Sequence, residues 1–447
     1  MDKNNKKIQE AKKIIKEEKK KIKQERKNIK KKKLNNFKKT RLGRFLGKFI
    51  YVFSDEKSSY SFSEVFVITI ISLVLGVFAC FSVVMIATKG RNLISLSKDL
   101  GKFYDVYETL IDNYNGDIDK EKIIDDAING MVSNVGDVYT NYADTSTTDK
   151  FNEMVNGVYE GIGCTIQQLE DAVKIVDIYE GSPADKAGLK VDDYIKTVDS
   201  KDALELGVAK ISEYVKNEAK GNIEMIVLRG DEEIKVTLKR DKVEIPAVSA
   251  KTFEKNGKKI GYLKISIFSS VSSKQFDSKI KELEKDGIDS LVIDVRGNNG
   301  GYLTAVTDIA SMLLPRGKNI YQIQKDNNKK ATKDKTFEKR EYPIAILVNG
   351  ESASASEILA GAIKESYNGY VVGTKTYGKG TVQQVKQLSD GSMIKYTVEN
   401  WLTPDGNWIN DVGIEPTDKV ELNEKYYENP TDETDNQLQK ALELVSG

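Results

Sequence analysis

The sequence predicts a mixed α/β protein that is attached to a membrane by a single N-terminal helix. Three observations lead to this prediction. An uncharged apolar run of about 23 residues occupies residues 65–87. Short β-branched runs alternate with turns in residues 156–243. From residue 246, strand-like runs alternate with helical stretches, and this second pattern is typical of a mainly parallel sheet. At 447 residues with 39% hydrophobic residues, the chain is long enough for two or three soluble domains.

Residues 1–64 form a basic tail. It carries about fourteen more Lys and Arg than Asp and Glu, although the net charge of the whole chain is only +1. The first 35 residues have the composition of a solvated helix. We interpret the tail as cytoplasmic and as a topology signal. Binding to anionic lipid or to RNA is the alternative, but the pattern is specific for neither, so no specific nucleic acid is expected.

The apolar run reads VFVITIISLVLGVFACFSVVMIA from Val65 to Ala87. At about 1.5 Å per residue it is long enough to cross a hydrocarbon core of about 30 Å, so we expect a transmembrane helix in contact with membrane lipid. A cleaved signal peptide is the alternative, but the run is longer than an ordinary apolar signal region, and no A-x-A site follows it. The basic residues that precede it include Lys38, Lys39, Arg41, Arg44 and Lys48. They favour a single-pass protein of the cell membrane with a cytoplasmic N-terminus and with everything after Lys89 outside the cytoplasm.

Two regions separate this helix from the parallel sheet. Residues 88–155 are predicted to be a helical N-terminal segment, because apolar residues such as Leu100, Tyr104 and Leu110 recur at helical spacing. We interpret this segment as a spacer or a packing element. In residues 156–243 the runs VKIVDI, YIKTV, IEMIVL and IKVTL surround one longer helical stretch, which predicts a small domain of strands and helices.

Residues 246–425 contain the strand-like runs YLKISI, SLVIDV, IAILVN and YVVGT, and residues 426–447 are left as a C-terminal segment. In a mainly parallel sheet, functional residues gather at the carboxyl ends of the strands. The ends of these strands are therefore the expected places for catalytic or binding residues.

The chain contains no histidine, which excludes Ser-His-Asp and Cys-His catalytic sites and every histidine-ligated metal. The two cysteines, Cys80 and Cys164, are too few for a zinc cluster and imply no disulfide framework. Histidine-ligated metals and cysteine-bound zinc are therefore not expected, and the catalytic chemistry inferred below needs no metal and no organic cofactor.

The first strand end that carries chemistry follows Leu291–Val295 and reads RGNNGG from Arg296 to Gly301. Paired glycines allow close approach of a ligand and can present backbone N–H groups to a developing negative charge. The alternative is that a tight connection from strand to helix needs glycine for its conformation alone.

The second strand end follows Ile344–Val348 and carries a cluster of three serines. Ser354 and Glu357 have the spacing of a capping box, so Ser354 could be no more than a helix cap. However, a serine on a sharp turn from strand to helix is exposed at the positive end of the helix, and the next N–H is free to bind an oxyanion. This arrangement suits a nucleophile.

Without histidine, the base that accepts a serine proton must be lysine, tyrosine or a carboxylate. A lysine can serve when burial lowers its pKa from about 10.4 toward neutrality. Lys379 stands between two glycines after the strand YVVGT, and it would share one face with Gln383 if the next strand already began at Lys379. The alternative is that Lys379 is an ordinary surface lysine.

Four blocks resemble the signature blocks of the carboxyl-terminal processing proteases, a family of Ser-Lys peptidases. They are SASASEILAGAI, VVGTKTYGKGTVQQ, LVIDVRGNNGGYL and WLTPDGNWINDVGIEP, and the resemblance covers roughly residues 95–420. It implies a serine endopeptidase with an α/β core of the crotonase or ClpP type. It also implies that Ser354 is the nucleophile, Lys379 the general base and Gln383 the residue that orients the lysine. The implied oxyanion hole consists of the N–H of Ala355 and that of Gly300 or Gly301. Asn299 departs from the family, which often has proline there.

The resemblance also implies that residues 156–243 are a PDZ domain. The stretch Gly161-Ile162-Gly163-Cys164 resembles the loop that binds a peptide C-terminus, and GSPADKAGL at residues 181–189 resembles the turn and short helix that follow. Asp192 stands where these domains usually have glycine. A flexible connection near residues 243–250 is expected to let this domain regulate cleavage.

Together these expectations describe a membrane-anchored serine endopeptidase that cleaves extracytoplasmic proteins and recognises their free C-termini through its PDZ domain. The chain could assemble as a homo-oligomer. The alternative function is that of a catalytically silent, membrane-tethered PDZ adaptor, which the presence of Ser354, Lys379 and Gln383 disfavours.

Overall fold

The computed structural model describes residues 16–32, 35, 61–87, 98–216, 221–337 and 340–447. The chain divides into two compact units, Met1–Ile118 and Asp119–Gly447, and we describe each by itself. The basic residues between Lys38 and Lys48, and also Lys89, lie outside the described residues.

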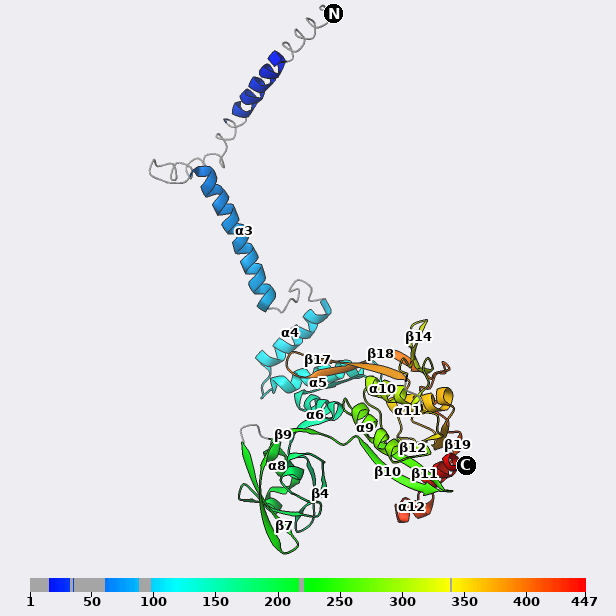
Figure 1. Cartoon of the computed structure of the whole chain (residues 1–447). Helices are drawn as coiled ribbons and strands as arrows, with labels where there is room; N and C mark the ends of the chain where they lie inside the picture. Colours follow the sequence, from blue (N-terminus) through cyan, green and yellow to red (C-terminus); the bar gives the residue numbers. More distant parts are fainter. Residues whose placement is uncertain (1–15, 33–34, 36–60, 88–97, 217–220, 338–339) are drawn as a thin grey trace, which may run out of the picture. The chain divides into compact units, whose positions relative to one another are not determined.

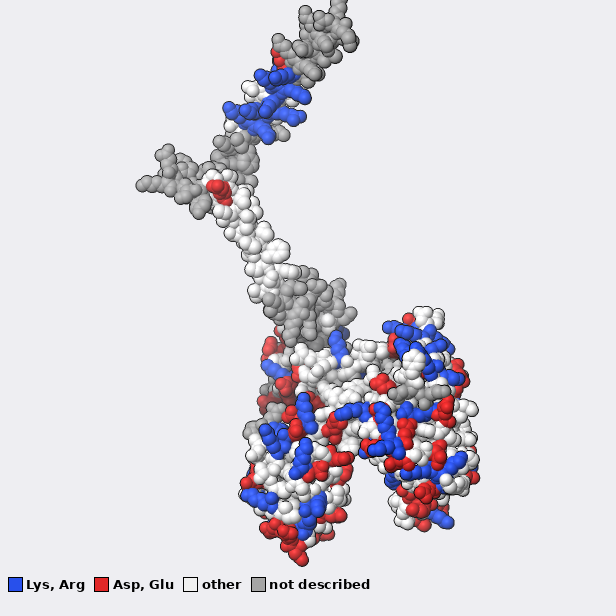
Figure 2. Space-filling model, in the orientation of Figure 1, with Lys and Arg blue, Asp and Glu red and all other residues white. Residues whose placement is uncertain are grey.

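The described residues of the first unit are mainly helical. Residues 16–32 are helical and exposed, and Figure 2 shows many Lys and Arg side chains on the visible face of this helix. The long helix α3 spans Phe62–Ala87, which includes the apolar run that the sequence predicts to be helical. Its stretch Ser63–Val83 has a mean hydropathy of 2.7 and is not buried within the protein. Helix α4, Lys98–Asn113, follows. Among the described residues, α3 is the one helix that is long and apolar enough to cross a membrane.

The small domain of the second unit is built on an antiparallel sheet in the order β3-β4-β5-β7-β8, with β6 paired to β5 (Figure 1). The strands and helices of this domain are β3 Cys164–Gln168, β4 Val173–Ile178, α7 Pro183–Lys186, β5 Tyr194–Val198, β6 Lys201–Asp202, α8 Ala203–Lys216, β7 Asn222–Arg229 and β8 Glu232–Lys239. Alternate residues of β4 and β7, such as Val173, Ile175, Ile223 and Met225, are fully buried and form a separate core to which α8 contributes Ile211 and Val215.

Two local features of the small domain bear on its function. Strands β2, Val158–Gly161, and β9, Asp241–Glu244, pair with each other, so the chain enters and leaves the domain through one two-stranded ribbon. Asp192 has a φ of 74°. Aspartate is among the residues that tolerate this left-handed conformation, so the turn keeps its shape although glycine is missing.

The large domain contains a six-stranded sheet in the order β10-β11-β12-β15-β16-β19. Its strands are β10 Val248–Lys255, β11 Lys258–Ile265, β12 Ser290–Asp294, β15 Ile344–Val348, β16 Tyr370–Gly373 and β19 Asp418–Lys419. Every pair is parallel except β10 with β11. The βα pattern of the sequence therefore predicted a mainly parallel sheet correctly, and it missed the antiparallel edge strand.

Helices cover both faces of this sheet (Figure 1). One face packs on α9 Ser272–Lys285, α10 Leu303–Leu313 and α11 Ala355–Gly361, which continues as η2 Ala362–Tyr367. The other face packs on α13, Asn436–Ser446, and the short helix α12, Glu424–Glu428, precedes α13. Because side chains alternate along a strand, Ile293 faces the first layer and Val292 faces α13. Residues 426–447 thus include a helix of the core.

A second, antiparallel sheet has the order β1-β18-β13-β14, with β17 also paired to β18. Its strands are β1 Asn141–Ala143, β13 Asn319–Lys325, β14 Asn328–Lys333, β17 Thr381–Gln387 and β18 Met393–Leu402. Strand β1 lies between helices α5, Lys120–Ser133, and α6, Thr145–Asn156, in the segment that the sequence predicts to be wholly helical. This segment therefore joins a sheet that also contains β17, the strand that follows Lys379.

Candidate active site

The two strand ends singled out in the sequence lie together. Strands β12 and β15 are parallel neighbours, so the loops that follow them leave the same edge of the sheet. Two serine hydroxyls of the cluster join these loops: Ser352 donates to the carbonyl of Val295 at 2.8 Å, and Ser356 donates to that of Asn298 at 2.7 Å. Both serines are fully buried, which suits a structural role.

Ser354, the middle serine, is partly exposed and immediately precedes α11. Its φ of 55° and ψ of −111° put a non-glycine residue into a strained backbone conformation, which costs about 1–3 kcal/mol and recurs at functional sites. A strained turn of this kind exposes the hydroxyl while the next N–H, that of Ala355, begins the helix. The backbone of Ser354 therefore has the geometry expected of a nucleophile elbow.

Glu357 connects the serine turn to the lysine loop. Its carboxylate is fully buried, and it accepts four hydrogen bonds. Oε2 accepts from the N–H of Ser354 at 2.8 Å and from that of Lys379 at 2.9 Å. Oε1 accepts from the hydroxyl of Thr376 and the N–H of Gly378, both at 2.7 Å. Glu357, which the capping-box spacing in the sequence had indicated, therefore holds the backbone of both residues of the predicted dyad, Ser354 and Lys379.

Lys379 has the properties of a base. Burial in the protein, followed by the charge of Lys395, lowers the pKa of the Lys379 amine to about 8, while the carboxylates of Glu357 and Asp137 oppose this shift. Among the described residues, the amine makes no hydrogen bond or ion pair. With this pKa about a tenth of the amine is in the free-base form at pH 7 and about half at pH 8, and the lone pair of the free base can accept a proton.

The later sequence block, WLTPDGNWINDVGIEP, holds the loop of Lys379 in place. The indole of the buried Trp401 donates to the carbonyl of Lys379 at 2.7 Å, and Asn410 accepts from the N–H of Gly380 at 3.1 Å. Gly413 packs so closely on this loop that a Cβ there would lie 2.4 Å from the carbonyl oxygen of Thr376. Through these contacts, residues of this block support the loop that carries Lys379.

The paired glycines lie next to the predicted nucleophile. A Cβ placed on Gly300 would be 2.9 Å from Ser354 Cβ and 3.1 Å from the nitrogen of Ala355. However, the N–H of Gly300 already donates to Oδ1 of Asn298 at 2.8 Å. Gly301 forms a parallel bridge to Phe268 that uses the neighbouring peptide groups, and its own N–H has no partner among the described residues. The N–H of Gly301 is therefore free for another acceptor in the described part of the chain, whereas that of Gly300 is already used.

Gln383 makes no hydrogen bond to Lys379 in the described part of the chain. Strand β17 begins at Thr381, two residues after the lysine, so the shared strand face that the sequence suggested does not form. The amide of Gln383 donates instead to the hydroxyls of Thr381 at 2.8 Å and Thr397 at 3.3 Å. An orienting role for Gln383 stays a prediction, and it would have to act through these threonines.

Two residues that we did not single out in the sequence lie near the lysine. The ring centroid of Tyr139 is 4.8 Å from the Lys379 amine, and the carboxylate of Asp137 acts on the same amine. They precede Lys379 by about 240 residues, and no local pattern marks them. Among the described residues, no group of three Asp, Glu or Cys side chains is arranged to hold a metal ion.

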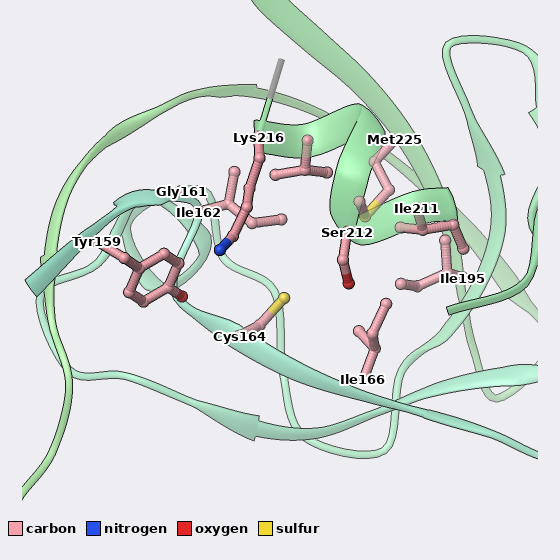
Figure 3. Close-up of a pocket in the computed structure, with 11 residues that line it drawn as sticks. Tyr159, Gly161, Ile162, Cys164, Ile166, Ile195, Ile211, Ser212, Lys216 and Met225 are labelled. Carbon is pink, nitrogen blue, oxygen red and sulfur yellow. The ribbon is translucent and has the colours of Figure 1, made fainter. Parts of the chain in front are cut away.

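The small domain carries a separate pocket, which Figure 3 shows. The pocket is lined by Tyr159, Gly161, Ile162, Cys164, Ile166, Ile195, Ile211, Ser212, Val215, Lys216 and Met225. It lies between α8 and β3, and β3 is an edge strand of its sheet. The Lys216 amine points toward Tyr159 and Cys164, which also line this mostly apolar pocket. Burial raises the pKa of the Cys164 thiol to about 12, so this side chain is a neutral lining group.

Together these features define a serine peptidase coupled to a peptide-binding domain. Residues 259–420 match the family model described as peptidase family S41, residues 174–229 match the PDZ domain, and residues 81–147 match the N-terminal domain of the activating protease CtpB. The chain belongs to the S41 peptidase family, and within it to the C-terminal processing serine proteases that carry a PDZ domain. The family assignment made from the sequence blocks is thus confirmed.

The chain is similar to several known proteins of this kind. It is 37% identical over 323 residues to the carboxy-terminal processing protease CtpB of Bacillus subtilis, a match that covers 72% of this chain and 67% of that protein. It is 33% identical over 356 residues to a probable CtpA-like serine protease of Staphylococcus aureus, with coverages of 77% and 71%. A solved photosystem II D1 C-terminal processing protease is 28% identical, with a TM-score of 0.42 and coverages of 77% and 91%.

Proposed function

We propose that this peptidase is a membrane-anchored endopeptidase that cleaves extracytoplasmic proteins with a dyad of Ser354 and Lys379. The hydroxyl oxygen of Ser354 attacks the peptide carbonyl carbon while the free amine of Lys379 accepts the hydroxyl proton. The N–H groups of Gly301 and Ala355 stabilise the resulting oxyanion. The Lys379 ammonium then gives its proton to the leaving amine, and the same lysine activates the water that hydrolyses the acyl-enzyme.

The observation that carries this proposal is that the Glu357 carboxylate bridges the two parts of the dyad. One buried oxygen of its carboxylate accepts from the N–H groups of both Ser354 and Lys379, which ties the strained serine turn to the loop of a lysine whose pKa is about 8. A lysine on an exposed loop would keep its ordinary pKa and would not act as a base at neutral pH.

A serine-reactive phosphonate probe tests the dyad directly. The wild-type protein should be labelled at Ser354, and Ser354→Ala should not be labelled. Lys379→Arg should lose both labelling and turnover, because a guanidinium cannot release its proton at workable pH. Ser356→Ala is the matched control, since that buried serine is expected to react with no probe. A wild-type protein that resists the probe and cleaves nothing would support the alternative, a silent PDZ adaptor.

Anchoring by α3 is the second part of the proposal. The length and hydropathy of Ser63–Val83 support an anchor, and the basic residues before it favour a cytoplasmic tail. Protease added to intact protoplasts should then remove the domains that follow α3 and spare the tail. A mature protein that lacks both the tail and α3 would show that this helix is a cleaved signal peptide and not an anchor. Protection of the catalytic domain would overturn the topology.

Capture of free C-termini by the PDZ pocket is the third part. An added peptide strand could pair with the edge strand β3, with its carboxylate at the Gly161–Cys164 loop and its last side chain in the apolar pocket. Lys216 lines this pocket and pairs with Glu153 of α6 at 2.6 Å. A peptide with a C-terminal amide should therefore be cleaved more slowly than the free acid, and Lys216→Gln should reduce the difference. Equal rates for the two peptides would refute carboxylate capture.

The PDZ domain is also proposed to regulate cleavage. The ribbon of β2 and β9 is the connection about which the domain could move. Deletion of residues 156–243 should change the rate and remove the dependence on a free C-terminus. If the deletion changes neither the rate nor the dependence on a free C-terminus, the PDZ domain does not regulate cleavage.

A further inference from the structure

The turn at residues 137–140 lies against the general base, although it is far from Lys379 in the sequence and lies outside the part matched by the peptidase family model. Strand β1 brings it there, because Asn141 pairs with Lys395 and Ala143 pairs with Met393 in β18. Strand β18 also pairs with β17, the strand that directly follows the lysine loop. The register of this sheet thus sets the turn beside the amine.

Three hydrogen bonds make the turn rigid. One oxygen of Asp137 accepts from the N–H of Tyr139 at 3.0 Å, and the other accepts from the hydroxyl of Thr140 at 2.5 Å. The same hydroxyl of Thr140 accepts from the N–H of Thr397 in β18 at 3.2 Å. With both carboxylate oxygens occupied, the ring of Tyr139 and the charge of Asp137 are held at fixed positions relative to β18.

We propose that Tyr139 and Asp137 are positioning residues of the reaction: the Tyr139 ring covers the Lys379 amine at a centroid distance of 4.8 Å, and the Asp137 carboxylate balances its charge. The inference rests on the proposed role of Lys379 as general base. A ring face within about 6 Å attracts a cation, so the ring favours the ammonium form and fixes where the amine lies. The N-terminal segment is then part of the active site and not a spacer.

The charge balance around the amine involves several elements. The acidic groups that face it are Glu357 of α11 and Asp137 of the turn, and the nearby basic group is Lys395 of β18. Tyr377, on the lysine loop, and Asp411 act on Tyr139. Burial, a hydrogen bond to Tyr377 and these negative charges raise the pKa of the Tyr139 phenol to about 12, so Tyr139 stays neutral while Lys379 titrates.

Asp137 is ionised at neutral pH. Burial opposes its ionisation, but hydrogen bonds from Thr140, Thr397 and the backbone of Tyr139, with the Lys379 charge, hold the pKa of Asp137 below its ordinary value. Its negative charge therefore acts against the desolvation of Lys379. Loss of either the ring or the carboxylate should lower the pKa of the amine further, and it should also release the amine from its position.

The test is the pH profile of peptide cleavage by the full-length protein. In wild type, kcat should rise with an apparent pKa near 8. Tyr139→Leu keeps an apolar side chain over the amine but removes the ring, so the rising limb should move to lower pH by roughly half a unit, and the plateau kcat should fall about tenfold with a smaller change in KM. Tyr139→Phe keeps the ring and should restore the wild-type profile.

Asp137→Asn is a second test variant, because it removes the negative charge and keeps one acceptor oxygen. It should also shift the rising limb of the pH profile to lower pH. Asp126→Asn is the matched control, since it neutralises an exposed carboxylate of α5 and should leave the profile unchanged. Lys395→Met should shift the limb to higher pH, because it removes a positive charge near the amine.

The outcomes separate this inference from the dyad itself. If the apparent pKa of the rising limb stays near 8 in Tyr139→Leu, Asp137→Asn and Lys395→Met, the positioning role of Tyr139 and Asp137 is refuted and the dyad is unaffected. A wild-type profile without this limb, or activity in Lys379→Arg, would instead refute the role of Lys379. Opposite shifts for Asp137→Asn and Lys395→Met would support the inference even if Tyr139→Leu did not fold.

Discussion

Replacement of Glu357 by glutamine is the sharpest perturbation of this site. Each carboxylate oxygen accepts two hydrogen bonds, at distances between 2.7 and 2.9 Å. In Glu357→Gln one oxygen becomes an NH₂ group, which faces two donors and can accept from neither. The substitution therefore removes two hydrogen bonds to a charged group, whichever way the amide is oriented.

The expected magnitude follows from this geometry. Each hydrogen bond to a charged group contributes about 1.5–3 kcal/mol, so the loss of two should destabilise the fold by about 3–6 kcal/mol. That is a large share of the ordinary stability of a domain, about 5–15 kcal/mol. Activity should fall as well, since the turn of Ser354 and the loop of Lys379 lose their common acceptor.

Denaturant unfolding of the solubilised protein would measure the stability change, and kcat would be measured under conditions in which the variant is folded. Glu351→Gln is the control, because Glu351 is an exposed carboxylate only three residues before Ser354. It should change the free energy of unfolding by less than about 0.5 kcal/mol. If Glu357→Gln were as stable and active as Glu351→Gln, Glu357 would not hold the dyad together.

Three further predictions concern the dyad and its oxyanion hole. Ser354→Gly should be inactive yet more stable than Ser354→Ala by about 1 kcal/mol, because glycine relieves the strain of a φ of 55°; equal denaturation midpoints would contradict the strained turn. Lys379→Met should raise the free energy of unfolding by about 1–3 kcal/mol below pH 8, because the native protein no longer charges a buried amine. The native pKa is depressed, so this gain should shrink as pH rises from 8 toward 10.5, and a gain independent of pH would refute the depressed pKa. Gly301→Ala should lower kcat about 100-fold or more, since its Cβ would lie 2.2 Å from the carbonyl oxygen of Phe268 and displace the proposed N–H donor; retained activity would exclude Gly301 from the oxyanion hole.

Some features were determined by the sequence alone, because they depend on composition or on neighbours along the chain. The apolar run at residues 65–87 requires only length and hydropathy, and α3 covers it. The mainly parallel sheet follows from alternating β-branched and helical runs, and the structure confirms it. The lack of histidine directed attention to a lysine base, and the four blocks identified the peptidase family and its PDZ domain, both of which the comparisons confirm.

Other features were decided only by tertiary structure. The sequence offered both Gly300 and Gly301 as oxyanion donors, and the hydrogen bond from Gly300 to Asn298 now favours Gly301. The sequence suggested that Gln383 would share a face with Lys379 if the strand already began at Lys379, but β17 begins at Thr381 and the Gln383 amide donates to two threonines.

The basicity of Lys379 also depends on the tertiary structure. Burial and the charge of Lys395 lower the pKa of its amine, and the carboxylates of Glu357 and Asp137 raise it. The pairing of β1 with β18 brings the turn that carries Asp137 to a lysine about 240 residues away in the chain. No local pattern encodes this proximity, because electrostatic effects depend on distance in space and on solvent exclusion, which exist only once the chain has folded.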